Sequence, residues 1–346
     1  LEENIDKTLD LLSEKLFNPG FNEDDFSRIK KDNIQLYKDL FKNKEEMASN
    51  ILNEKMFGDN AYGGFTTEKD IKKVKLKDVK KYYDKAFAPN ISNITIVSSY
   101  EKTDIISKLS MFNSWKKKNV EIPGSFTFPD AKPTEIYIYD IPGATQSAIR
   151  IGHRSLKYSY NDMFYKNQIM NYSLGDGFIS SRLELNLRED KGFTYGIGSR
   201  FIGDKIAGKF LVSSNIRTSA TDSALTEILF EIENYVKKGI TTDELKFVKQ
   251  TMLNSKLMGY ESNRQKLNHL SFINKYSIPK NYIVEQQNIT KSIEKEDIDK
   301  VAKANIHVDN LIIVIAGNKY VIKKKLENLT SKDGRRYNFK VTEIKY

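Results

Sequence analysis

The chain has 346 residues, 39% of them hydrophobic, no cysteine and a formal net charge of +10. The lack of cysteine excludes disulfides, thiolate metal sites and cysteine nucleophiles, and no apolar run approaches the roughly 18 residues that a membrane-spanning helix needs. Because the length exceeds one comfortable hydrophobic core, we expect two folded domains and no membrane span.

The sequence pattern of the N-terminal part predicts mainly helices. The chain begins at Leu1 without an initiator methionine or a signal-peptide pattern, so we expect a fragment or a processed chain. Beyond Gly20, acidic residues precede a long amphipathic helix. A short helix around residues 77–81 and an apolar strand at 93–97 follow. Residues 113–133 contain three prolines among polar residues, which is typical of a linker.

Three segments recur later in the chain at nearly the same spacing. The matches are residues 20–31 with 239–250, residues 77–81 with 296–300, and residues 93–97 with 310–314. The first two pairs share one offset, and the third slips by two positions. Three ordered matches at nearly one offset indicate a duplication. We therefore predict a first α+β repeat at 1–112, truncated at its N-terminus, and a complete second α+β repeat at 134–346.

The second repeat starts with a segment that has no counterpart in the first. Residues 134–140 and 146–152 alternate apolar and polar side chains, which predicts two antiparallel neighbouring strands joined across Pro142 and Gly143. Beyond them we expect, in order, helices at 161–174 and 179–188 and β-segments at 193–201 and 207–216. Segregated runs of strands and helices favour an α+β fold with a mostly antiparallel sheet.

The positive charge raises nucleic-acid binding as one alternative. Most lysines, however, are spread along expected helices, and the two tight clusters, Lys116–Lys118 and Lys323–Lys325, are short. Neither cluster adjoins an aromatic-glycine recognition pattern or a zinc finger. We expect a solvated basic surface and no nucleic-acid partner.

Common catalytic signatures are missing from the sequence. The histidines, His153, His269 and His307, form neither H-E-x-x-H nor its inverted form, so a helical zinc site within this chain is not expected. Each is expected to be an ordinary structural histidine. A serine-nucleophile elbow, a phosphate-binding loop and a dinucleotide fingerprint are also absent. We expect no metal ligand and no catalytic residue in this chain alone.

The most informative stretch is residues 174–195. Glycines at 175 and 177 break one helix and allow a close turn, and Ser180 and Ser181 can cap the next helix. Taken alone, Arg188 reads as a cation near a helix C-terminus and Tyr195 as a strand aromatic.

This stretch resembles the C-terminal type of domain in the insulinase/pitrilysin/mitochondrial-processing-peptidase family of zinc metallopeptidases. The matching residues are Gly175, Gly177, Ser180, Ser181, Arg182, Leu183, Leu187, Arg188, Glu189, Lys191, Gly192 and Tyr195. The resemblance extends over nearly the whole chain and implies a duplicated half of the LuxS/insulinase-like fold. In such enzymes one half holds zinc through H-x-x-E-H and a downstream glutamate. The other half supplies an arginine and, seven positions later, a tyrosine that bind the substrate backbone.

The resemblance implies that Arg188 and Tyr195 are substrate-binding residues, because a guanidinium and a phenol can both donate to peptide carbonyls. It also implies that this is the zinc-less half. Where the downstream glutamate would stand, the chain has Asn33–Tyr37, with no acid before Asp39.

We therefore predict a substrate-binding half that is inactive alone. It would complete the active site of a zinc-bearing half, in the same longer chain or in a separate subunit, and would help to hydrolyse unfolded peptides. The alternatives are a structural scaffold of the same family and a basic nucleic-acid-binding protein. The compartment stays open; the bacterial periplasm and secretion are both compatible with the resemblance.

Overall fold

The computed structural model describes residues 2–255 and 261–346. They form two compact units that alternate along the sequence. The first unit contains the segment up to Lys38, residues 66–123 and helix α11 (Asn263–Tyr276). The second contains residues 39–65, the chain from Gly124 through helix α10, and residues 278–346.

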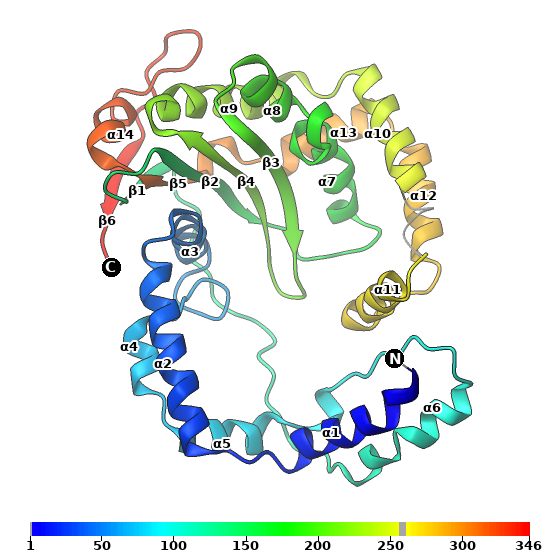
Figure 1. The fold of residues 1–346 in the computed structure, drawn as a ribbon. Helices are drawn as coiled ribbons and strands as arrows, with labels where there is room; N and C mark the ends of the chain where they lie inside the picture. Colours follow the sequence, from blue (N-terminus) through cyan, green and yellow to red (C-terminus); the bar gives the residue numbers. More distant parts are fainter. Residues whose placement is uncertain (1, 256–260) are drawn as a thin grey trace. The chain divides into compact units, whose positions relative to one another are not determined.

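The first unit is helical (Figure 1). Besides α11, its helices are α1 (Ile5–Phe17), α2 (Glu23–Leu40, whose last two residues belong to the second unit), α4 (Glu68–Lys73), α5 (Leu76–Ala86) and α6 (Lys102–Lys108). Residues 92–98 have no regular structure, so the strand expected at 93–97 is wrong. A strand needs hydrogen-bonding partners on a neighbouring backbone, and the described part of this unit contains no strand that could pair with it.

The second unit is built on a six-stranded sheet. Its strands are β1 (Glu135–Asp140), β2 (Gln146–Ser155), β3 (Thr194–Gly203), β4 (Gly208–Arg217), β5 (Ile312–Gly317) and β6 (Lys340–Ile344). Its helices are α3 (Lys44–Phe57), α7 (Met163–Asn171), α8 (Arg182–Glu184), α9 (Thr221–Lys238), α10 (Thr242–Ser255), α12 (Tyr282–Ser292), α13 (Lys295–Asn305) and α14 (Lys319–Leu326).

The strand order is β3-β4-β2-β5-β1-β6. The two strands expected to be antiparallel neighbours, β1 and β2, are therefore separated by β5, which pairs parallel with β1 and antiparallel with β2. β5 reads Ile-Ile-Val-Ile-Ala-Gly and is apolar on both faces, as a central strand must be. Three strand pairs are antiparallel and two are parallel, so the sheet is mixed.

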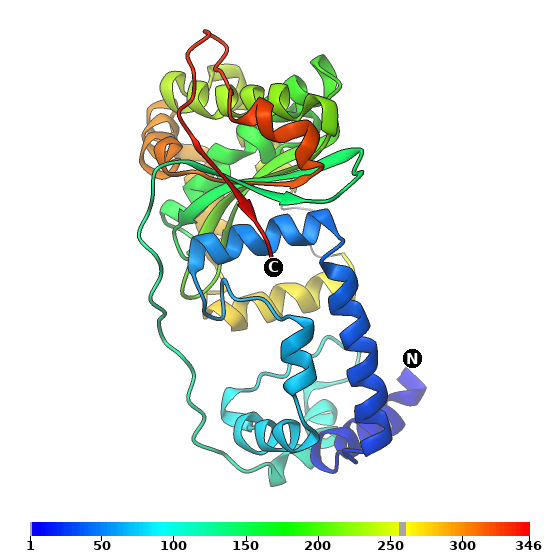
Figure 2. The same cartoon turned by 90° about the vertical axis from the view of Figure 1, so that its left-hand side faces the viewer.

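Both faces of the sheet are covered by helices (Figures 1 and 2). On one face, Ile149 and Ile151 of β2 belong to a large core that includes residues of α7, α9 and α13. On the other face, α3 buries Met47 and Ile51 against residues such as Ala148 of β2. The unit is thus a helix–sheet–helix sandwich, the α+β architecture expected from the sequence.

The element bounds recur at the offset seen in the sequence. The shift that carries residue 20 to residue 239 also carries both ends of α3 onto those of α11, and both ends of α5 onto those of α13. This recurrence supports the duplication, and the repeat boundaries at 1–112, 113–133 and 134–346 remain a prediction. Residues 116–132, most of the expected linker, have no helix or strand. Among the described residues, no helix has the length and hydropathy needed to cross a membrane.

Candidate functional site

The glycine-rich turn packs directly against strand β3. α7 continues beyond Asn171 into a wider π-type turn at Tyr172–Asp176. A Cβ at Gly175 would lie 2.2 Å from the Ser199 Oγ and 2.5 Å from the Ser199 amide nitrogen, so this approach requires glycine. The Asn171 amide also donates to the Ser199 carbonyl (2.7 Å) and accepts from its hydroxyl (2.6 Å). The turn therefore fixes the start of the motif on the sheet.

The helix expected at 179–188 is not continuous. It consists of a 3₁₀ turn (Phe178–Ser180), the short α8 and a π-type turn (Leu185–Asp190). Ser181 occupies the N-cap position of α8 but makes no capping hydrogen bond, and the Ser180 hydroxyl donates to the Gly177 carbonyl instead (2.8 Å). The prediction that these serines cap the helix is therefore wrong. The Ser180 hydroxyl is hydrogen-bonded within the preceding tight turn, and the Ser181 side chain makes no capping bond.

Arg182 ties the motif to helix α10, a role that the sequence analysis missed. Its Nε and Nη2 each donate to the Glu244 carboxylate at 2.6 Å, and Nη2 also donates to the Gly239 carbonyl at 2.9 Å. Burial lowers the pKa of Arg182, but the hydrogen bonds to Glu244 and the negative charges nearby, Glu244 first among them, together outweigh it, so the net shift is upward. The two partners lie far apart in the chain, and no local sequence signal reveals the pair.

Arg188 is positioned by a buried carboxylate. Its Nη1 donates to Glu184 Oε1 at 3.0 Å, one helical turn earlier, and its Nε lies 3.4 Å from Glu189 Oε1. The Glu184 side chain is buried, and its Oε2 accepts from the Ile197 amide at 2.8 Å. The hydrogen bond with Glu184 raises the pKa of Arg188, so the guanidinium stays charged. Arg188 is thus joined through one carboxylate to the backbone of β3.

Tyr195 stands at the beginning of β3, an edge strand of the sheet, with 91% of its surface exposed. The pairing of β3 with β4 shifts register between Thr194 and Ile197, which marks a β-bulge around Tyr195 and Gly196. Ser214 holds this bulge by donating to the Gly196 carbonyl at 2.9 Å. Bulges commonly redirect a side chain at a sheet edge, and here the phenol is presented to solvent.

A polar pocket of about 320 Å³ adjoins Tyr195. Its lining residues come from β2, β3 and β4: Gln146, Arg150, Thr194, Tyr195, Gly196, Ser213, Ser214 and Asn215. Tyr195 lines this pocket and Arg188 is not among its lining residues. Arg188 is therefore connected to β3, the strand that carries Tyr195, through Glu184 and the Ile197 amide. Of the two predicted residues, only Tyr195 lines the pocket.

The pocket contains a partly buried cation, Arg150, which the sequence analysis did not single out. Its Nε donates to the Ser49 hydroxyl of α3 (3.1 Å) and its Nη1 to the Ser214 carbonyl (3.3 Å). Burial lowers the pKa of Arg150, and nearby Glu45 partly opposes this shift. Asn215 donates to Glu45 Oε1 (3.1 Å), whereas its own buried Oδ1 accepts from none of the described residues. The pocket thus offers a cationic donor to a polar group.

His153 is a core residue, as the sequence suggested. It is 3% exposed; its Nδ1 lies 2.7 Å from the Arg154 carbonyl, and its Nε2 accepts from the His307 amide at 3.1 Å. The ring is therefore neutral with its proton on Nδ1. Burial lowers the pKa of His153 to about 4. Within residues 2–255 and 261–346, no three His, Cys, Asp or Glu side chains are grouped so that they could hold a metal ion.

Comparison with known proteins places the chain in a family. Residues 73–252, more than half of the chain, match the model of the peptidase M16 inactive domain. A non-peptidase homolog, YmxG of Helicobacter pylori, is 22% identical over 92% of this chain and 74% of its own length. An uncharacterized zinc protease, also YmxG, of Bacillus subtilis is 22% identical over 77% of this chain and 64% of its own length.

Solved structures show the same fold. The peptidase M16 inactive domain from Pseudomonas fluorescens has a TM-score of 0.81 at 22% identity, covering 90% of this chain and 74% of that one. The periplasmic protease PqqL from Escherichia coli has a TM-score of 0.69 at 16% identity, covering 92% of this chain but 35% of that one. The expected insulinase/pitrilysin resemblance is confirmed, and the chain belongs to the peptidase M16 family as an inactive domain.

Proposed function

We propose that this chain is the peptide-binding, zinc-less half of an M16-type peptidase. In this proposal Arg188 and Tyr195 hold an extended peptide while a zinc-bearing half, in the same longer chain or in a separate subunit, carries out the hydrolysis. The exposed, bulge-presented phenol of Tyr195 carries the proposal, because a large aromatic side chain gains little stability in such a position.

The chemistry required of the two residues is hydrogen-bond donation. A guanidinium has five N–H groups, and the Arg188–Glu184 bond uses one of them. The phenol of Tyr195 adds one O–H donor. Donors fixed near a peptide carbonyl orient the substrate and stabilise negative charge that develops on the oxygen when water attacks. The metal-activated water and the general base would come from the zinc-bearing half.

The pocket beside Tyr195 would receive a side chain of the bound peptide. Arg150 supplies a positive charge there, and a partly desolvated guanidinium binds a carboxylate more strongly than an exposed one does. We therefore expect a preference for acidic or amide side chains at the position that enters this pocket.

Hydrolysis of an unstructured fluorogenic peptide by the reconstituted pair of halves tests the proposal. Arg188→Ala and Tyr195→Phe should each lower kcat/KM by roughly tenfold or more, as removal of a transition-state donor does. Arg217→Ala and Tyr320→Phe are matched controls on exposed residues outside the motif. Unchanged kcat/KM in both motif variants would leave a scaffolding role, which the name of the Helicobacter relative, a non-peptidase homolog, also suits.

A further inference from the structure

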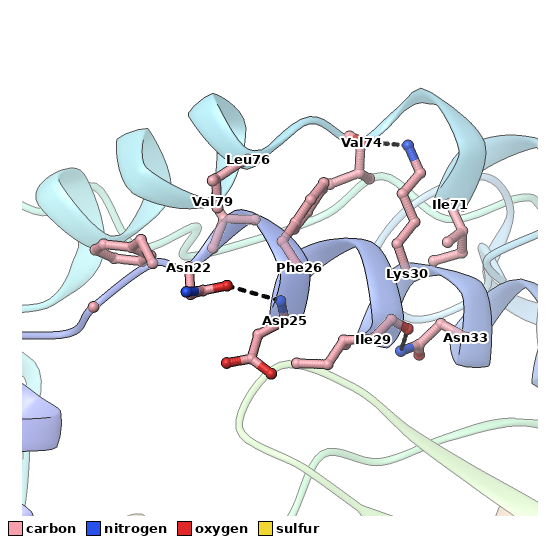
Figure 3. Close-up of a pocket in the computed structure, with 12 residues that line it drawn as sticks. Asn22, Asp25, Phe26, Ile29, Lys30, Asn33, Ile71, Val74, Leu76 and Val79 are labelled. Carbon is pink, nitrogen blue, oxygen red and sulfur yellow. Dashed lines mark hydrogen bonds between the residues drawn. The ribbon is translucent and has the colours of Figure 1, made fainter.

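The pocket beside Tyr195 differs in its lining from the larger pocket of the first unit. That larger pocket, a groove of about 490 Å³ along α2, α4 and α5, is lined mainly by apolar side chains such as Phe26 and Ile29 (Figure 3). The lining of the pocket beside Tyr195 is polar and includes the hydroxyl-bearing residues Thr194 and Ser214. Both hydroxyls bind the backbone of the bulge that presents Tyr195.

The bulge adds one residue to β3. Thr194 pairs with Ile216 in the ladder between β3 and β4, and the next pair is Ile197 with Ser214. A step of three residues on β3 therefore faces a step of two on β4, and the extra residue lies between Thr194 and Ile197. The backbone groups of an extra residue have no partner in the ladder. Water or neighbouring side chains must bind them instead.

Two side-chain hydroxyls bind the backbone of Gly196. The Gly196 amide donates to Thr194 Oγ1 at 3.1 Å, and the Gly196 carbonyl accepts from the Ser214 hydroxyl at 2.9 Å. The Thr194 hydroxyl lies 2.8 Å from the Asn215 carbonyl and 2.9 Å from the Gly196 carbonyl. Because a hydroxyl has one proton, every group is satisfied when Thr194 donates to Asn215 and Ser214 donates to Gly196. We call this arrangement of Thr194, Ser214 and the Gly196 backbone the hydroxyl clamp.

The hydroxyl clamp fixes the backbone on both sides of Tyr195. The hydrogen bond from the Gly196 amide to the Thr194 side chain spans the tyrosine. The Tyr195 side chain is exposed, so packing contributes little to its direction and the backbone has to set it. Ser214 also holds the cation of the pocket, since its carbonyl accepts from Arg150 Nη1 at 3.3 Å. One residue of β4 thus connects the phenol with the guanidinium of the pocket.

We infer that Thr194 and Ser214 are positioning residues for Tyr195, a role that rests on the proposed function because Tyr195 must bind the peptide for its position to matter. Their hydroxyls hold the Gly196 backbone so that the phenol stands beside the pocket that contains Arg150, where it donates to the bound peptide. Neither hydroxyl contacts the peptide. Both act through the backbone of the bulge.

Substitutions that keep the shape of Thr194 and remove its hydroxyl test the inference. In the reconstituted pair of halves, with the unstructured fluorogenic peptide as substrate, Thr194→Val should lower kcat/KM by roughly five- to tenfold. Ser214→Ala should act in the same direction. Thr194→Ser keeps the hydroxyl and should retain most of the activity. Thr342→Val is the matched control, because Thr342 is also half-buried and lies on β6, the opposite edge strand of the sheet.

A double-mutant cycle shows whether Thr194 acts through Tyr195. In a Tyr195→Phe background, Thr194→Val should change kcat/KM by less than about twofold, because the hydroxyl that it positions is already missing. Equal losses in both backgrounds would overturn the inference. An effect of Tyr195→Phe without an effect of Thr194→Val would overturn the inference and leave the proposed function standing. No effect of Tyr195→Phe would remove the proposed role of Tyr195 and the inference with it.

Hydrogen–deuterium exchange of the isolated chain tests the hydroxyl clamp without a partner. The Gly196 amide loses its acceptor in Thr194→Val, so its exchange should be roughly tenfold faster than in the wild type. Thr194→Ser and Thr342→Val should leave this exchange unchanged, and circular dichroism checks that each variant is folded. Unchanged exchange at Gly196 in both Thr194→Val and Ser214→Ala would overturn the inference, because the bulge would then hold without the two hydroxyls.

Discussion

The guanidinium of Arg188 is held by the carboxylate of Glu184, with 3.0 Å between Nη1 and Oε1. The other oxygen of the same buried carboxylate accepts from the Ile197 amide. One acid therefore sets the position of the proposed substrate-binding arginine relative to the strand that carries Tyr195. A family motif that looks like a linear string of residues is in fact a small three-dimensional network around Glu184.

Glu184→Gln should weaken this network. The substitution keeps the shape and an acceptor for the Ile197 amide but removes the charge that Arg188 meets, so the free energy of unfolding should fall by about 1–2 kcal/mol. Urea unfolding measures the loss. In an Arg188→Ala background the same substitution should cost less, because the pair is already broken. Equal losses in both backgrounds would show that Glu184 does not act through Arg188.

Loss of the hydroxyl should destabilise the protein at one tyrosine and have little effect on stability at another. Tyr235 is fully buried and its hydroxyl donates to the Met170 carbonyl at 2.9 Å, so Tyr235→Phe should lower the free energy of unfolding by about 1–2 kcal/mol. Tyr195→Phe should change it by less than about 0.5 kcal/mol, because the phenol is exposed. Thermal and urea unfolding of both variants check this. A large loss in Tyr195→Phe would give that residue a structural role.

Gly175→Ala should be strongly destabilising. The added Cβ would meet the backbone of β3 at Ser199, which cannot move without disturbing the sheet. We expect a loss of about 3 kcal/mol in the free energy of unfolding. Gly124→Ala is the control, since a Cβ placed there has no neighbour within 4 Å among the described residues. Similar stability of the two variants would mean that the turn at Gly175 yields easily.

Stability should fall in mild acid because of His153. Its pKa is about 4 in the folded chain and near 6.5 when unfolded. Between pH 6.5 and pH 4, the unfolded state therefore binds a proton at His153 that the folded state does not bind. The resulting stability is fully present above pH 6.5 and is lost progressively as the pH falls towards 4, by about 3 kcal/mol in total.

The measurement is urea unfolding between pH 7 and pH 4.5 for the wild type and for His153→Gln. The wild type should lose more stability over this range than the variant, because the variant lacks the titrating ring. His269→Gln, on helix α11, serves as the control and should keep most of the wild-type dependence. Parallel curves for the wild type and His153→Gln would contradict the prediction.

The sequence predicted most elements of the second unit because their patterns are local. Strands β3 and β4 lie within one or two positions of the expected segments 193–201 and 207–216. The order of the strands was not predictable in this way. β1 and β2 are joined by a short turn, yet β5, which comes near the end of the chain, lies between them. Alternation tells which face a side chain occupies but not which strand is its neighbour.

The candidate site was predictable only in part. Arg188 and Tyr195 stand in a contiguous motif, so a family resemblance sufficed to select them, and their roles stay predictions. Arg150 lies on β2 and meets Ser49 of α3 and Ser214 of β4. These three positions are brought together by the sheet and by the packing of α3, and no spacing in the sequence expresses that. A single arginine within a strand of alternating apolar and polar residues carries no sequence signal that marks it as a candidate binding residue.

Helix α3 has a consequence for how the chain is made. It belongs to the first repeat by sequence, yet the surface on which it rests is formed by β2 and β5, and β5 comes near the opposite end of the chain. During synthesis from the N-terminus, the apolar side of α3 cannot pack against its complete surface on the sheet until β5 has left the ribosome. If the chain is divided within residues 113–133, we therefore expect that neither fragment folds to a soluble product when it is expressed alone. Co-expression of both fragments should restore solubility.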